Sequence, residues 1–200
     1  MSRKTISDIR RQELVDATIR CIHAQGFSQV TMISIAKEAG SSAASINYYF
    51  GSKDHLLEYT MQLLLSRLRK ALITRYARAE GPYERLLAVV EANFDDDVYT
   101  VEICAVWMQF WAVAPYVPRL ARLYRINTRR VRSNLRAALA DVLPEERQET
   151  VRRAIQAYMD GAWIAAAQSD LPVDAAAGRT EAKAVLDTLL GYIASRKHRR

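Results

Sequence analysis

The chain has 200 residues, half of them apolar, and a formal net charge of +7 at pH 7. This length suffices for one large domain or two smaller ones around a real core, and the low counts of 7 Gly and 5 Pro argue for an all-helical fold. No apolar run is long enough to cross a bilayer, and no apolar segment typical of a signal peptide opens the chain. We therefore expect a cytoplasmic protein that does not bind membranes.

The first predicted helix begins near Ile9 and ends at Gly26. A polar, basic arm comes before it, with Arg3, Lys4, Arg10 and Arg11. Such an arm can reach a DNA groove or phosphate, and a frayed terminus is the alternative. Charge alone does not predict DNA binding here, because basic and acidic residues nearly balance over residues 1–60.

Residues 31–57 predict two short helices joined by a tight turn. Thr31 can cap the first, because its hydroxyl can accept a free backbone N–H of the first turn. Gly40 ends that helix, since glycine takes left-handed conformations at little steric cost. Ser41 or Ser42 caps the second helix, in which we expect one buried side, formed by Ala43, Ile46 and Phe50. Two short helices around a glycine turn are typical of a helix-turn-helix motif, and an ordinary helical hairpin is the alternative.

The whole string, with Ala39-Gly40, a Ser-capped helix, Tyr49-Phe50 and Lys53 at the next helix start, resembles the DNA-binding region of the TetR family of transcriptional repressors. The resemblance implies an all-α homodimer with two domains. Residues 1–52 would form a three-helix helix-turn-helix domain that binds double-stranded operator DNA. Residues 53–200 would form a helical ligand-binding and dimerisation domain.

The family motif, matched position by position, implies which residues contact DNA. They are Thr31, Ser42, Ala43, Ser45, Asn47, Tyr48, Tyr49 and Lys53. The second helix has no Arg or Gln for bidentate base recognition, so specificity would come from methyl contacts, Asn47, DNA shape and half-site spacing. A helical wheel does not settle which tyrosine is the contact, and packing against the first helix is the alternative for each.

Apolar spacing, glycines and prolines predict six further helices, at about residues 53–78, 82–94, 101–114, 119–143, from 145 onward and 179–195. We expect the last two to form the dimer interface, through Ile155, Met159, Ala162, Ala166, Val185, Leu189 and Ile193. Cys21 and Cys104 have no disulfide or metal-site spacing and are expected to be buried and reduced. The three histidines form no ligand pattern, so we expect no metal and no cofactor.

Several strings in the second half resemble the BetI group of this family: Asn93-Phe94-Asp95, Trp107-Met-Gln-Phe-Trp111, Arg129-Arg130, Ser133-Asn134-Leu135 and Asp160-Gly-Ala-Trp163. The resemblance implies a repressor of the genes that convert choline to the osmoprotectant glycine betaine. Its effector would be a small cation, choline or betaine aldehyde. A TetR-type regulator of multidrug efflux, induced by a larger aromatic cation, is the alternative.

The chemistry of the residues agrees with a quaternary ammonium ligand. This group has no N–H donor, so aromatic faces and nearby negative charge must hold it. The candidate residues are Phe94, Asp95, Trp107, Trp111, Asp160 and Trp163. Helical spacing puts Trp107 with Trp111, and Asp160 with Trp163, on shared faces. Tryptophans on helix faces are as often core residues, which is the alternative.

Two other features leave alternatives open. Arg122, Arg125, Arg129, Arg132 and Arg136 form a basic stripe, which is either a solvated face or a second anion-binding surface. No Ser/His/Asp arrangement, Cys/His arrangement, carboxylate pair or nucleotide loop supports an enzyme. A helical interaction module without a ligand is a further alternative. As a mechanism, we expect ligand binding to tilt the helix from Lys53 to Arg78 and so change the spacing of the two DNA-binding heads.

Overall fold

A computed structural model describes residues 5–191, and every regular element within them is helical. The elements are α1 (Ile6–Gln25), α2 (Met32–Glu38), α3 (Ala43–Phe50), α4 (Lys53–Tyr76), α5 (Pro82–Glu91), η1 (Ala92–Phe94), α6 (Val101–Val113), η2 (Ala114–Tyr116), α7 (Pro118–Ala140), α8 (Glu145–Ala167) and α9 (Ala175–Leu190). The all-α prediction is confirmed. None of the described helices is both long and apolar enough to cross a membrane.

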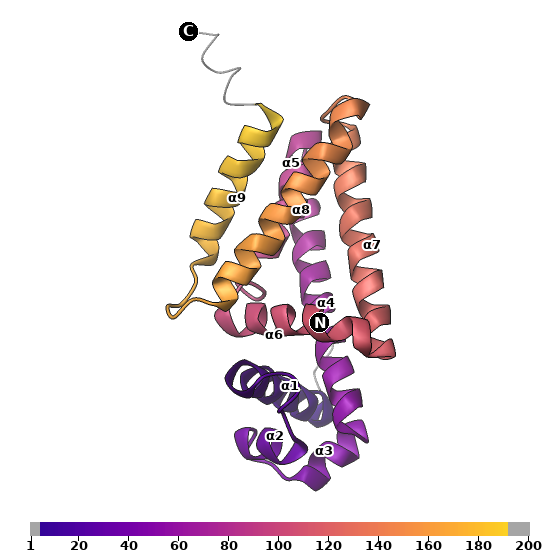
Figure 1. Ribbon diagram of the computed structural model, residues 1–200, viewed down its shortest axis with the longest axis vertical. Coiled ribbons are helices and arrows are strands. Elements are labelled where there is room, and N and C mark those ends of the chain that lie inside the picture. Colours follow the sequence, from indigo (N-terminus) through magenta and orange to yellow (C-terminus); the bar gives the residue numbers. More distant parts are fainter. Residues whose placement is uncertain (1–4, 192–200) are drawn as a thin grey trace.

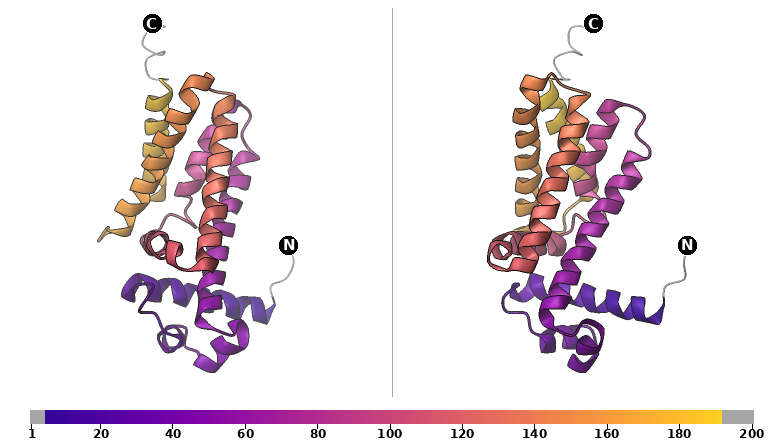
Figure 2. Two further views of the ribbon diagram at one scale, coloured as in Figure 1. Left: turned by 45° about the vertical axis from the view of Figure 1, so that its right-hand side comes forward. Right: turned by 90° about the vertical axis from the view of Figure 1, so that its right-hand side faces the viewer.

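The helices form a small head and a larger body (Figure 1). We call α1–α3 the head and α5–α9 with the intervening 3-10 turns the body. Helix α4 begins in the head and continues along the body, where α5, α7, α8 and α9 also run lengthwise. Helix α6 lies across the molecule between the two parts, above α1 (Figures 1 and 2). This placement makes α4 and α6 the two helices that can connect events in the body to the head.

Capping residues fix the ends of the short head helices as predicted. The Thr31 hydroxyl accepts the Ser34 N–H at 3.0 Å, and the Ser42 hydroxyl accepts the Ser45 N–H at 3.1 Å. Gly40 has φ +58°, which allows the sharp turn between α2 and α3. Because the caps set where each helix begins, they also set which residues of α3 face outward.

Several boundaries differ from the sequence-based prediction. Helix α1 begins at Ile6, one turn early, because Thr5 and Asp8 form a capping box. Arg10 and Arg11 therefore lie in a helix and not in the arm, while Arg3 and Lys4 lie outside the described residues. Helix α9 begins at Ala175, since Asp174 caps it by accepting two backbone N–H groups. The basic tail from Arg196 also lies outside the described residues.

One of the two hydrophobic cores extends from the head into the body. It includes Ile22 and Ile46 of the head together with Trp107, Phe110 and Trp163 of the body. A second core is confined to the body, between α5, α7, α8 and α9. Both cysteines, Cys21 and Cys104, are buried and free in the first core, as predicted. Head and body thus share apolar packing as well as a continuous helix.

The predicted dimer face of α8 is wrong in its residues. Ile155, Met159 and Ala166 are buried inside the single chain, so they are not available to a partner. The outer face of α8 instead carries the small exposed residues Ala157, Gly161 and Ala165. Val185 and Leu189 of α9 are half-buried, and Ile193 lies outside the described residues.

Candidate functional site

Helix α3 offers its outer face to solvent at the end of the head. Ser42, Ala43, Asn47 and Tyr48 are exposed, and Ser45 is half-buried. The expectation that Ala43 shares the buried side is wrong, because it lies in the first turn, beyond the reach of the core formed by Ile46 and Phe50. Its exposure does agree with its other predicted role, a methyl contact to DNA.

Three of the predicted DNA contacts also have structural partners. Thr31 and Ser42 use their hydroxyl oxygens as helix caps. The Thr31 O–H also donates to the Ser34 Oγ at 3.2 Å, so Thr31 would have to exchange this bond to donate to a phosphate oxygen, whereas Ser42 would donate its own O–H. The Lys53 ammonium donates to the Val30 carbonyl at 3.0 Å. This bond holds Lys53 beside the first turn of α2. Thr31 and Lys53 are therefore brought together at one edge of the head.

The two tyrosines of α3 differ sharply in environment. Tyr48 is 83% exposed. Tyr49 is half-buried against the head core, and the Arg11 guanidinium of α1 lies 6.0 Å from the centroid of its ring. The structure thus places Tyr49 in the packing role against α1 and leaves Tyr48 free to contact another molecule.

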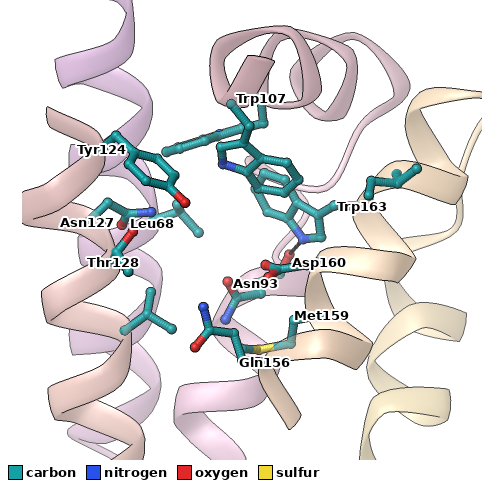
Figure 3. A pocket seen from close by; sticks show the side chains of 13 residues that line it. Leu68, Asn93, Trp107, Tyr124, Asn127, Thr128, Gln156, Met159, Asp160 and Trp163 are labelled. Atoms are coloured by element: carbon teal, nitrogen blue, oxygen red, sulfur yellow. Dashed lines mark hydrogen bonds between the residues drawn. The ribbon is translucent and has the colours of Figure 1, made fainter. Parts of the chain in front are cut away.

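A cavity of about 290 Å³ lies in the body where α4, η1, α6, α7 and α8 meet. Four of the six predicted ligand residues line it: Trp107, Trp111, Asp160 and Trp163. Figure 3 shows Trp107 entering from α6, Tyr124, Asn127 and Thr128 from α7, and Gln156, Asp160 and Trp163 from α8. Residues 56 positions apart in sequence, Trp107 and Trp163, are brought into one site.

The three indole rings of the chain form one cluster beside this cavity. The Trp107 ring centroid lies 6.3 Å from that of Trp111 and 5.8 Å from that of Trp163. Trp163 is fixed further, because its indole N–H donates to the Asn93 carbonyl at 3.0 Å. Trp107 and Trp163 are only 1% and 4% exposed, so they are core residues that also present part of their surface to the cavity. Their burial agrees with the core alternative, and their place in the cavity wall is compatible with the predicted ligand role, which stays a prediction.

Asp160 is the acidic side chain among the cavity-lining residues. Desolvation by the surrounding protein raises the pKa of its carboxyl, although the residue is exposed in the single chain. Within residues 5–191, no ion pair or side-chain hydrogen bond is formed by this group. In Figure 3 its carboxylate lies near Asn93 and Trp163. A negative charge held beside aromatic rings, without a positive partner, is suited to a cationic ligand.

Amide groups add polar atoms to the cavity wall. The Asn93 amide nitrogen donates to the Val89 carbonyl at 3.0 Å, which leaves its side-chain oxygen as an acceptor. The Gln156 oxygen accepts from the Arg152 guanidinium at 2.8 Å, which leaves the Gln156 NH₂ group as a donor. Because Arg152 is neutralised by two hydrogen bonds to Glu149, it does not add an unpaired positive charge near the cavity.

Phe94 and Asp95 do not line the cavity, contrary to expectation. Phe94 is 0% exposed and packs in the body core, with its ring centroid 5.0 Å from that of Tyr99. Asp95 forms an ion pair with Arg75 of α4 at 3.1 Å. The 3-10 turn η1 rotates these side chains away from the cavity, and their neighbour Asn93 faces it instead.

Sequence reasoning missed most of the α7 wall. The missed residues of that wall are Tyr124, Asn127, Thr128 and Val131. Their spacing of i, i+3, i+4 and i+7 defines one helical face, so the signal was present. It was obscured by the arginines on the same helix. Arg122, Arg125, Arg129, Arg132 and Arg136 are all exposed, and within the described part of the chain none has an acidic partner within 4.0 Å.

Comparisons with known proteins agree with this geometry. Residues 14–60 match the family model of bacterial regulatory proteins of the tetR family, and residues 82–191 match that of the BetI-type transcriptional repressor C-terminal domain. The HTH-type transcriptional regulator BetI of Burkholderia mallei is 39% identical over 191 residues, which cover 95% of this chain and 98% of that protein.

Solved structures share the fold. A TetR transcription regulator from Haloarcula marismortui has a TM-score of 0.68 at 24% identity, over 90% of this chain and 97% of that one. A protein from Saccharomonospora viridis, solved in complex with choline, has a TM-score of 0.74 at 20% identity, over 88% of this chain and 95% of that one.

Proposed function

The chain belongs to the TetR family of transcriptional regulators, which is not an enzyme family, and has a BetI-type C-terminal repressor domain; from this premise we propose that it represses choline-to-glycine-betaine genes in response to choline. The observation that carries the proposal is the unpaired Asp160 carboxylate beside three tryptophans in one cavity. A structural neighbour solved with choline supports the same ligand class.

The size of the cavity favours a small effector over a larger aromatic cation. Its volume of about 290 Å³ is at the lower end of the range of about 300–1,000 Å³ that is usual for ligand sites. The trimethylammonium group would lie against Trp107, Trp111 and Trp163, with Asp160 supplying the negative charge. The remaining hydroxyl or aldehyde oxygen of the effector would meet the polar α7 wall or the Gln156 amide. A multidrug regulator would need a larger space.

The proposed DNA site is the outer face of the head. Tyr48, Asn47 and Ala43 of α3 would enter the major groove, with Thr31 and Lys53 on the phosphates at its edge. The protein would act in the cytoplasm as a homodimer, through the small exposed residues of α8 together with α9. We keep the division at Ser52 as a functional one, with the DNA contacts before it or directly after it, at Lys53, and the ligand contacts in the body.

Helix α4 connects the two proposed sites. It begins at Lys53, on the DNA side, and its Leu68 lines the cavity. A ligand that changes the position of Leu68 would tilt α4 and alter the spacing of the two heads in the dimer. A coupling free energy of about 1–3 kcal/mol between the sites is typical for such regulation.

The first experiment is a choline titration followed by tryptophan fluorescence, because all three tryptophans of the chain line the cavity. We expect saturable quenching by choline. The neutral isostere 3,3-dimethyl-1-butanol should have no effect, since it lacks the charge that pairs with Asp160. Glycine betaine should bind more weakly, because its carboxylate is repelled by Asp160. Equal responses to choline and the neutral isostere would contradict the proposal.

The second experiment tests release from DNA. An operator is first selected from random duplexes with the purified protein, and its affinity is then measured by fluorescence anisotropy with and without choline. We expect choline to weaken binding about five- to 150-fold, the usual range of allosteric coupling. An operator affinity that choline leaves unchanged would refute the release mechanism while leaving DNA binding intact.

A further inference from the structure

Helix α6 takes part in both the cavity and the contact with the head. Trp107 and Trp111 line the cavity. Gln109, halfway between them in sequence, lies on the opposite side of α6 and contacts the end of α1. Because the three residues lie on one helix, a ligand that shifts the backbone of α6 through the tryptophans would also shift Gln109. The two faces of α6 thus connect ligand and head without passing through α4.

The Gln109 side chain completes the end of α1. Its Nε2 donates to the Ile22 carbonyl at 3.2 Å, and its Oε1 accepts the backbone N–H of Phe27. The Ile22 carbonyl also accepts the Gly26 N–H at 2.9 Å, which is the last turn of the helix. Both polar atoms of one amide are therefore used to satisfy backbone groups of another element, which is the task of a helix cap.

The backbone conformation of this turn favours glycine. Gly26 has φ +87°, and a Cβ built there would lie in ordinary van der Waals contact with Gln109 Oε1, at 3.6 Å. The turn then leads in a few residues to Val30, whose carbonyl accepts from Lys53, and to Thr31, the cap of α2. Gln109 is consequently joined, through a short and hydrogen-bonded segment, to the edge of the head that we assign to DNA phosphates.

We propose that Gln109 is a coupling residue, which transmits occupancy of the cavity to the DNA-binding head by holding or releasing the turn between α1 and α2. The inference rests on the proposed function, because it assumes that the cavity binds an effector. It differs from the tilt of α4 in the route: the signal crosses from α6 to α1 through two side-chain hydrogen bonds.

The test uses Gln109→Met, which keeps the length of the side chain but removes both hydrogen bonds. Glu102→Ala, at an exposed position on the same helix, is the matched control. The measured quantity is the ratio of operator affinities without and with saturating choline. We expect a ratio of about tenfold in the wild type and the control, and at most twofold in Gln109→Met. Choline affinity without DNA, followed by fluorescence, should change less than twofold.

A full coupling ratio in Gln109→Met, at unchanged thermal stability, would overturn the inference and assign the route to α4. The absence of any fluorescence response to choline in the wild type would instead overturn the proposed function.

A second experiment needs no ligand, so that failure of the coupling role of Gln109 can be told apart from failure of the proposed function. Ile164→Trp fills the cavity from α8, and its effect on operator affinity is compared in the wild-type and Gln109→Met backgrounds. We expect the logarithm of the fold-change in operator affinity caused by Ile164→Trp to be at most half as large in the Gln109→Met background as in the wild type. Equal effects in the two backgrounds, including none in either, would overturn the coupling role of Gln109.

Discussion

The DNA-facing surface of the head and the cavity of the body are built in different ways. The surface consists of neighbours in sequence on α3, next to the first turns of α2 and α4, and hydroxyl caps set their orientation. The cavity takes side chains from five elements that are far apart in the chain. Local sequence patterns therefore predict the DNA-facing surface, whereas the cavity follows only from the way the helices pack together.

The two regions also differ in how charge is arranged. At the head, Lys53 is tied to the Val30 carbonyl, and Arg11 lies over aromatic rings, so the cations near α3 are held in place by the protein itself. In the cavity, Asp160 is an anion without a partner among the described residues. A partly desolvated group whose charge is left unpaired is the better indicator of a small ligand, because its desolvation costs free energy until a counter-charge arrives.

The largest expected effect is on choline binding by Asp160→Asn. The substitution keeps the shape of the side chain but removes the negative charge that faces the ammonium. We expect choline to bind about 30- to 100-fold more weakly, or about 2–3 kcal/mol. Fluorescence titration or calorimetry measures the change. Asp170→Asn, at an exposed site beyond α8, is the control and should bind choline as the wild type does. Unaltered binding in Asp160→Asn would mean that the aromatic rings alone hold the ligand.

The pH dependence is the next expected effect, and it should be opposite in sign for ligand binding and for stability. Desolvation raises the pKa of Asp160 above the ordinary value of about 3.9. Choline binding needs the ionised carboxylate, so affinity should fall as pH drops through this raised pKa. The free energy of unfolding of the empty protein responds in the other direction. The contribution of Asp160 to the free energy of unfolding is fully present below about pH 3.9 and is lost as pH rises through the folded-state pKa of Asp160.

Both pH effects can be measured against the same control. Asp160→Asn should remove the Asp160 contribution from the pH profile of choline affinity and from that of urea unfolding. A choline affinity in the wild type that stays constant down to the ordinary range of aspartate would contradict the raised pKa.

An intermediate effect is expected from the two tyrosines of α3. Tyr48→Ala should weaken operator binding about five- to tenfold, because the exposed ring is free to contact DNA, with stability changed by less than about 0.5 kcal/mol. Tyr49→Ala should instead lower the free energy of unfolding by about 1–2 kcal/mol, since its half-buried ring packs on the head core. Anisotropy and urea unfolding measure the two quantities. The reverse pattern would exchange the roles that we assign to these residues.

The extent to which sequence predicted each region follows from this contrast. Thr31 and Ser42 mark helix starts by their own chemistry, so the starts of α2 and α3 were predicted to within a residue. Trp107, Trp111, Asp160 and Trp163 were predicted from the resemblance to the BetI group and from quaternary ammonium chemistry, and the structure brings them to one cavity. Tyr124 and Asn127 were missed, since their spacing defines a face of α7 but only the packing of the helices shows that this face turns toward the cavity. Phe94 and Asp95 were misplaced because a short 3-10 turn changes the direction of side chains within two residues.

The smallest expected effect concerns the two cysteines, which lie on either side of the contact between the two regions. Cys21 is in α1 and Cys104 is in α6, and both are buried in the core that joins head and body. Burial raises the pKa of both thiols, and that of Cys104 to about 12. At pH 8 the thiolate fraction of Cys104 is therefore about one in ten thousand, against about one in four for an ordinary thiol with a pKa of about 8.5.

We therefore expect neither cysteine to react with a thiol-specific reagent while the protein is folded, with or without choline. Two thiols should become reactive only on unfolding in denaturant, which a colorimetric titration measures. This result sharpens the comparison of the regions, because it separates two kinds of motion at their contact. A head that pivots as α6 shifts would keep its core closed and both thiols protected. A head that detaches from the body would expose Cys21 first. Selective labelling of Cys21 in the presence of choline would therefore show that DNA release proceeds by separation of head and body, and not by a small displacement of the turn between α1 and α2.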